Sequence, residues 1–144
     1  MSEVVVGLDV GSKRIGVAIG DTLVKIASPL DAVTNDQTTF SILRDLFLKH
    51  QSKVVVVGLP RNNDGLETRQ SQYSRDFAIS LDRYLKDHGL ALTFAMQDES
   101  LTSVKAEKIL RRQKGFEESM IKDGTLDSMA ASLILSDYLE SGQL

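Results

Sequence analysis

Short apolar runs separated by turn-forming residues dominate the first quarter of the chain. Residues 3–10, 14–21 and about 24–33 each show the pattern of a β-strand. The second and third runs are joined by a short turn near Asp21, and so short a connection forces antiparallel neighbours. Pro29 lies in the third run, which predicts that this strand is at an edge of the sheet.

The rest of the chain alternates helical and strand patterns. Apolar residues at helical spacing predict helices over residues 37–50, 67–88, 101–113 and 125–139. Between them, residues 53–59 and 90–96 predict two further strands, and the continuous apolar run of the first suits a strand buried on both faces. The charged segment 114–124, bounded by glycines, predicts a mobile loop.

This order of elements predicts an α/β fold. A right-handed crossover places the fourth strand beside the first and parallel to it, and the fifth strand extends the sheet. The predicted architecture is a mixed five-stranded sheet, three antiparallel strands followed by two parallel ones, flanked by helices. This is the ribonuclease H-like topology. A length of 144 residues predicts that residues 1–144 form a single domain.

Composition narrows the possible chemistry. The chain has no cysteine, which excludes a disulfide framework, a thiolate zinc site and a cysteine nucleophile. Its two histidines, His50 and His88, fall near predicted helix C-termini, where we interpret them as capping residues.

The N-terminus lacks a signal pattern and no apolar run approaches transmembrane length, so we expect a cytoplasmic protein without membrane association. The net charge of -3 does not indicate a strongly basic nucleic-acid-binding chain, although local basic patches remain open.

Three acids are predicted to meet at one edge of this sheet. Asp9 lies inside the first apolar run, Glu99 just past the fifth strand, and Asp127 in the first turn of the last helix. In such sheets, sites collect at the carboxyl ends of the parallel strands. Carboxylates in proximity raise each other's pKa values, and a divalent cation resolves this repulsion. Metal-dependent phosphoryl chemistry, which needs no nucleophilic side chain, is therefore the predicted use of this site.

Each acid also has a simpler interpretation. Asp9 could be a turn acid that accepts backbone N–H groups. Glu99 could belong to a helix N-cap, and Asp127 could simply favour the dipole of its helix. Taken singly, the spacing does not decide between the two interpretations of Glu99 or of Asp127. The joint pattern favours a shared site.

Four motifs carry a resemblance to a known family, and they span nearly the whole chain in the family's order. They are GLDVGSKRIGVAIGD (7–21), VVVVGLPRNNDG (54–65), QDESLTS (97–103) and LDSMAASLIL (126–135). The chain resembles the YqgF/RuvX family of pre-16S rRNA nucleases and Holliday junction resolvases. The resemblance implies a ribonuclease H-like hydrolase that uses Mg²⁺ or Mn²⁺ and trims the 5′ end of the 16S rRNA precursor in bacteria. It also implies that Asp9, Glu99 and Asp127 are the catalytic residues and metal ligands.

One position departs from the family pattern. Ser100 stands where the family usually has an arginine, a cation that would hold a scissile phosphate or screen the acids. Lys13, Arg14 or Arg61 could replace it, since each is predicted near the same edge. The stretch 105–114 is the one concentrated basic segment; it could neutralise phosphates or be an ordinary solvated helix face. Its predicted nucleic-acid-binding residues are Lys105, Lys108, Arg111 and Arg112.

Several functions remain open from the sequence. The expected partners are RNA (pre-16S rRNA) or branched DNA, together with ribosomal particles, for a monomer or a homodimer. A Holliday junction resolvase is the first alternative. An actin-like or sugar-kinase-like phosphotransferase also begins with a strand, an aspartate and a glycine turn, as in residues 8–12, but encloses ATP between two such domains. A non-catalytic ribosome-assembly or transcription factor would not need Asp9 to be acidic.

Overall fold

The computed structural model describes residues 2–62, 64–99 and 102–141, with the backbone alone for 102 and 103. Its sheet has five strands in the order β3-β2-β1-β4-β5. β1 pairs antiparallel with β2, β2 antiparallel with β3, β1 parallel with β4, and β4 parallel with β5. The strands are β1 (Val4–Val10), β2 (Arg14–Asp21), β3 (Ser28–Thr34), β4 (Ser52–Pro60) and β5 (Thr93–Glu99). The predicted topology and the ribonuclease H-like fold class are confirmed.

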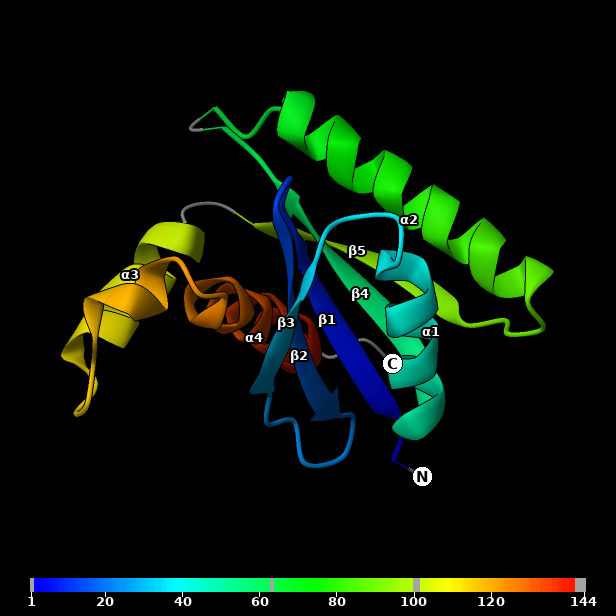
Figure 1. Cartoon of the computed structure of the whole chain (residues 1–144), viewed down its shortest axis with the longest axis horizontal. Coiled ribbons are helices and arrows are strands. Elements are labelled where there is room, and N and C mark those ends of the chain that lie inside the picture. Colours follow the sequence, from blue (N-terminus) through cyan, green and yellow to red (C-terminus); the bar gives the residue numbers. More distant parts are fainter. Residues whose placement is uncertain (1, 63, 100–101, 142–144) are drawn as a thin grey trace.

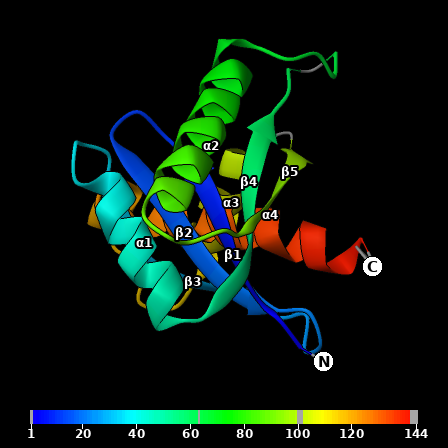
Figure 2. The ribbon, with the colours of Figure 1, turned by 90° about the vertical axis from the view of Figure 1, so that its right-hand side faces the viewer.

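Helices cover both faces of this sheet (Figures 1 and 2). They are α1 (Thr39–Lys49), α2 (Arg69–Asp87), α3 (Thr102–Arg112) and α4 (Thr125–Glu140). One core, between the sheet and α1 and α2, contains Leu8, Phe47 and Leu81. A smaller core, between the sheet and α4, contains Val5, Ala131 and Leu135. α3 packs beside α4 rather than on the sheet. In the described residues, no helix is long and apolar enough to cross a membrane.

Two strands begin later than the sequence pattern predicts, each because a turn uses the preceding residues. Before β3, the Asp21 carboxylate accepts hydrogen bonds from the backbone N–H groups of Leu23 and Val24, at 2.7 and 3.0 Å. This turn delays the strand from residue 24 to residue 28. Before β5, Gly89 has a φ of 80° and the Leu90 N–H donates to the Leu85 carbonyl at 2.8 Å, which closes the end of α2. Consequently β5 spans residues 93–99 rather than 90–96.

The segment predicted as a mobile loop, residues 114–124, includes a short 3₁₀ helix, η1 (Glu118–Ile121). The Glu118 carboxylate pairs with Arg111 at 2.8 Å.

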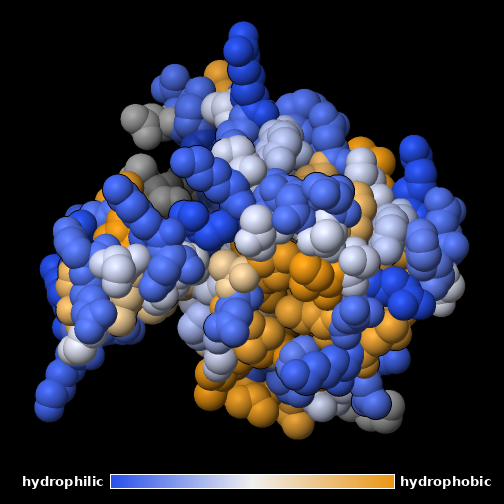
Figure 3. Space-filling model, in the orientation of Figure 1, coloured by the Kyte–Doolittle hydropathy of each residue, from blue (hydrophilic) through white to orange (hydrophobic). Residues whose placement is uncertain are grey.

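Apolar side chains gather along the lower edge in Figure 3, where the loop between β2 and β3 exposes Leu23, Val24 and Ile26. Hydrophilic side chains cover most of the surface over α3 (Figure 3).

Candidate active site

Asp9 projects from β1 toward the face covered by α4. Alternate residues of a strand share a face, and Val5 on this strand belongs to the α4 core, whereas Leu8 and Val10 belong to the opposite core. Asp9 lies near the C-terminal end of β1, after residues 5–8, which are buried. Its side chain is removed from most of the solvent, so its charged form is disfavoured.

Gly16 brings Asp127 to the same place. Gly16 is the residue of β2 that pairs with Asp9 across the antiparallel ladder. A Cβ atom at this position would lie only 2.0 Å from the backbone oxygen of Asp127, so the first turn of α4 rests directly on the strand. The Val17 N–H, next along the strand, donates to the buried Ser128 hydroxyl at 3.1 Å and fixes the helix there. Asp127 thus reaches Asp9 because a glycine leaves room for its backbone.

Gly58 brings in Glu99 from the other side. In β4, Gly58 follows Val57, which is paired with Leu8, and so it lies beside Asp9. A Cβ atom on Gly58 would approach the Glu99 Oε1 atom to 3.3 Å and the Ile134 Cδ1 atom to 2.5 Å. The Glu99 carboxylate consequently lies over a glycine of the neighbouring strand. Glu99 is the last residue of β5, rather than just past the strand end as the sequence pattern predicts.

The charges of Glu99 and Asp127 both act on Asp9. Burial, together with these two negative charges, raises the pKa of Asp9 from 3.8 to about 7. Arg14 compensates part of the negative charge, since its Nε donates to the Asp127 Oδ2 atom at 2.8 Å. Glu99 and Asp127 therefore lie near enough to Asp9 to affect its charge, with an arginine beside Asp127. Such a group can accept a cation or a proton.

The donor set fits a hard divalent cation better than any other cofactor. Carboxylate oxygens are the ligands that Mg²⁺ and Mn²⁺ prefer, and Asp9 is a buried carboxylate under the negative charges of Glu99 and Asp127. In the described part of the chain, no three acidic or histidine side chains are close enough together to ligate one ion directly. Asp127 is instead engaged with Arg14. Mg²⁺ retains several water ligands, which allows a carboxylate to bind it through water.

The cations named from the sequence lie in different environments. Besides Arg14, Arg61 donates its backbone N–H to the Glu99 carbonyl at 3.0 Å, and its guanidinium pairs with Asp98 at 3.0 Å. On α3, Arg111 pairs with Glu107 and Glu118 and its guanidinium lies 5.3 Å from the centre of the Phe116 ring. The remaining predicted residues are exposed, namely Lys13 in the β1–β2 turn and Lys105, Lys108 and Arg112 on α3. Ser100 lies outside the described residues.

Sequence reasoning missed the residues that position the acids. Gly16 and Gly58 interrupt β-branched strands, and an isolated glycine in a strand is a recognised sign of close backbone approach. That signal was available in the sequence. The sequence gives no such signal for Ser128, since nothing in a helical pattern indicates that a serine hydroxyl binds a strand N–H.

Comparison with known proteins places this geometry in a family. The family model described as RuvX, Holliday junction resolvase, matches residues 3–141. The chain belongs to the RuvX family. It is 34% identical over 136 residues to a protein of Sulfurihydrogenibium sp., covering 94% of this chain and 89% of that one. It is 36% identical over 139 residues to a protein of Lactobacillus gasseri, covering 94% of each. Both relatives carry the name "Putative pre-16S rRNA nuclease".

A solved structure supports the fold of this RuvX-family chain. The RuvC protein of T. thermophilus, in complex with a Holliday junction substrate, matches with a TM-score of 0.55. The match covers 98% of this chain and 97% of that one, at 15% sequence identity. At this identity the likeness concerns the fold alone. The chain therefore shares the ribonuclease H-like fold of that protein.

Proposed function

We propose that this protein is a divalent-metal-dependent nuclease that processes the 5′ end of pre-16S rRNA. As a member of the RuvX family, the chain is a hydrolase acting on phosphodiester bonds. The shared name of its relatives favours pre-16S rRNA as the substrate. The single observation that carries the mechanism is the buried Asp9 beside Glu99 and Asp127, since burial and these two charges together raise the pKa of Asp9 to about 7. The same proposal assigns the protein to the cytoplasm, where it meets precursor ribosomal particles.

In this proposal, Asp9, Glu99 and Asp127 hold the metal, Mg²⁺ or Mn²⁺. When bound, a divalent ion lowers the pKa of an attacking water and stabilises the departing oxygen of the phosphodiester. The chain's own contribution is to position the carboxylates. Gly16 leaves room for the backbone of Asp127, and Gly58 leaves room for Ile134 and the Glu99 carboxylate. Arg14 orients the Asp127 carboxylate through the hydrogen bond from its Nε.

Cations near the acids are proposed to hold the substrate. Arg14 is the first residue of β2 and pairs with Asp127, and Arg61 directly follows β4 and bonds to the Glu99 carbonyl. Both are proposed to replace the arginine that the family carries in place of Ser100. Lys13 and the basic residues of α3 (Lys105, Lys108, Arg111 and Arg112) extend this surface. Phosphate contacts make binding salt-dependent. If these residues bind phosphates, Arg14→Ala and Arg61→Ala each weaken substrate binding and reduce the slope of affinity against salt.

A cleavage assay tests the proposed function. Wild type and Asp9→Asn are incubated with pre-16S RNA ends or a synthetic four-way DNA junction, with Mg²⁺, with Mn²⁺ and with a chelator. Metal-dependent cleavage of the RNA by wild type, lost in Asp9→Asn by at least about 100-fold, is the expected result. Equal cleavage by both proteins would contradict the mechanism.

Holliday junction resolution is the second candidate, because the RuvX family model is described as that of a Holliday junction resolvase. The same active-site acids serve either substrate, because a fold does not specify its target. Preferential cleavage of the junction over the RNA ends would favour this candidate. A protein that binds RNA but cleaves neither substrate would instead be a non-catalytic assembly factor.

A further inference from the structure

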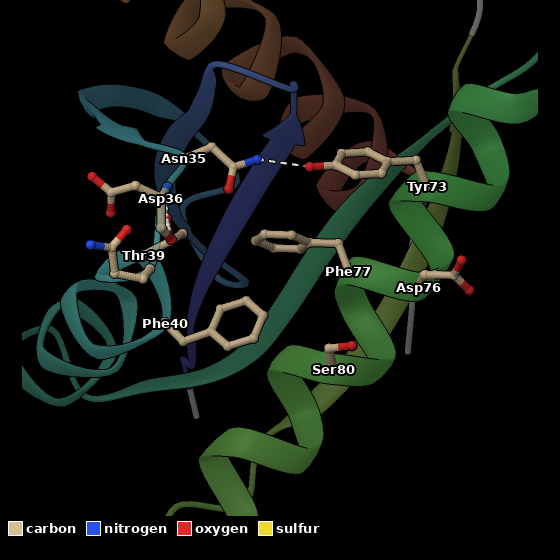
Figure 4. Close-up of a pocket in the computed structure, with 9 residues that line it drawn as sticks. Asn35, Asp36, Thr39, Phe40, Tyr73, Asp76, Phe77 and Ser80 are labelled. Carbon is tan, nitrogen blue, oxygen red and sulfur yellow. Dashed lines mark hydrogen bonds between the residues drawn. The ribbon is translucent and has the colours of Figure 1, made fainter.

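A second concave site lies on the other face of the sheet, between the start of α1 and the first half of α2 (Figure 4). Its cavity of about 460 Å³ falls within the roughly 300–1,000 Å³ of small-molecule sites. The aromatic rings of Phe40, Tyr73 and Phe77 point into it from both helices (Figure 4). The RuvX-family site described above uses none of these residues.

The rings form a platform suited to a planar group. Phe40 and Phe77 meet edge to face, with ring centres 5.4 Å apart, and Phe77 is only 8% exposed. Tyr73, one helical turn before Phe77 on α2, is 40% exposed at the rim. A partly exposed tyrosine beside a buried aromatic floor offers an apolar surface on which a base can stack.

The polar lining selects against phosphate. Asp36 and Asp76 both line the cavity and are exposed to solvent. Their carboxylates point away from the rings (Figure 4) and accept hydrogen bonds from Thr38 and Gln72. Negative charge at the rim of the cavity repels a phosphate. An uncharged planar base therefore fits this cavity better than the sugar–phosphate backbone does.

Asn35 joins this cavity to the turn that leaves the acidic site. Its Nδ2 donates to the Tyr73 hydroxyl at 2.9 Å and to the Gly11 carbonyl at 2.8 Å, and its backbone N–H donates to the Lys13 carbonyl at 2.9 Å. Gly11 follows Asp9 by two residues, a step of about 7 Å in an extended chain. The cavity and the acids thus lie at the same end of β1, on opposite faces, with the exposed Lys13 in the turn there.

We propose that the α1–α2 cavity binds one unpaired nucleobase of the strand that is cut at Asp9. The strand passes over the end of β1, where Lys13 contacts a phosphate while the base enters the cavity. Recognition of a splayed-out base by stacking and edge contacts is the usual way in which proteins read single-stranded RNA. This inference rests on the proposed nuclease function, since it uses the same nucleic-acid strand.

Fluorescence of 2-aminopurine tests the cavity without requiring catalysis. Short unstructured RNAs, each with one 2-aminopurine in turn at successive positions, are titrated with protein in the presence of a chelator. Matched DNA oligomers distinguish the two possible sources of the base. We expect quenching at one position and an affinity that falls about tenfold in Tyr73→Ala. Tyr73→Phe keeps the ring and should bind like wild type. Ile79→Ala, at an exposed position of α2 outside the cavity, is the matched control.

A second variant covers the possibility that Tyr73→Ala does not fold. Phe40→Leu replaces a half-buried ring of the cavity with an aliphatic side chain and should also reduce the quenching and the affinity. Quenching and affinity that are unchanged in both variants would overturn the cavity proposal, whichever nucleic acid is used. A cleavage assay distinguishes this proposal from the nuclease function. Cleavage by wild type with no effect of Tyr73 or Phe40 on binding would contradict the cavity proposal alone, whereas Tyr73-dependent quenching without any cleavage would contradict the nuclease function alone.

Discussion

The two faces of the sheet are packed by opposite means. On the face of α1 and α2, large side chains such as Phe47, Leu81 and Leu85 are at most 1% exposed and fill the space between helix and strand. On the face of α4, glycines of the strands meet the helix, and at Gly16 the helix backbone itself touches the strand. The acids lie on this second face.

The two faces therefore contribute differently to the stability of the fold and to the positioning of the acids. Hydrophobic stabilisation grows with the apolar area removed from water, so the α1–α2 face contributes most of it. The α4 face contributes less area but brings a helix N-terminus within contact of a strand, which large side chains would prevent. Mutations on the two faces should therefore have separable effects on stability and on cleavage.

The largest expected contrast is at Asp9 itself. The Asp9 pKa is 3.8 when unperturbed and about 7 in the fold, so between these values the folded state holds the proton more tightly. The stability of the metal-free protein should fall as pH rises from about 4 to 7 and then level off. Asp9→Asn lacks this loss and should be more stable than wild type at pH 8, by up to about 4 kcal/mol. Urea unfolding at pH 5 and pH 8 measures the difference.

Added Mg²⁺ provides the control for this prediction. A cation bound by the acids should raise the unfolding midpoint of wild type and leave Asp9→Asn nearly unchanged. If Asp9→Asn were less stable than wild type at pH 8, the Asp9 carboxylate would not be destabilised by the burial and repulsion described for the acidic site.

Truncation on the opposite face should affect stability alone. Leu81→Ala removes a fully buried side chain from the larger core and should cost about 2–5 kcal/mol. Cleavage by the folded protein, measured well below the unfolding midpoint, should remain at the wild-type rate. A large loss of cleavage without unfolding would show that the two faces are coupled.

Replacing a glycine on the α4 face with alanine should lower both the stability of the protein and its cleavage activity. Gly16→Ala forces the first turn of α4 away from β2, at a cost of about 3 kcal/mol, and displaces Asp127 from Asp9. Cleavage should fall together with stability. Gly20→Ala is the matched control in the same strand, since its nearest contact is the flexible end of Leu139, at 2.9 Å. Gly20→Ala should lower the free energy of unfolding by less than Gly16→Ala does, and it should leave cleavage unaffected.

The smallest expected effect concerns the hydrogen bond that fixes α4. Ser128→Ala leaves the buried Val17 N–H without its acceptor and should cost about 1–3 kcal/mol. Cleavage should fall only slightly, because Gly16 still admits the helix. Ser132→Ala, a nearly buried serine whose hydroxyl bonds only within α4, is the control and should cost less.

The sequence by itself determined the elements, their order in the sheet and the edge at which the acids meet. These follow from local periodicity, from the handedness of crossovers and from the positions of Asp9 and Asp127 in their elements. The errors were in strand starts, as at β5, because a helix-closing turn after Gly89 uses residues that the hydrophobic pattern assigns to the strand.

Only the tertiary structure decided how the acids come together. The contact of Gly16 with the Asp127 backbone, the ion pair of Arg14 with Asp127 and the raised pKa of Asp9 all join residues distant in the chain. The aromatic cavity between α1 and α2 is likewise formed by residues from separate elements. Local patterns encode which face a residue occupies, but distances and electric fields depend on how closely the packed elements approach one another.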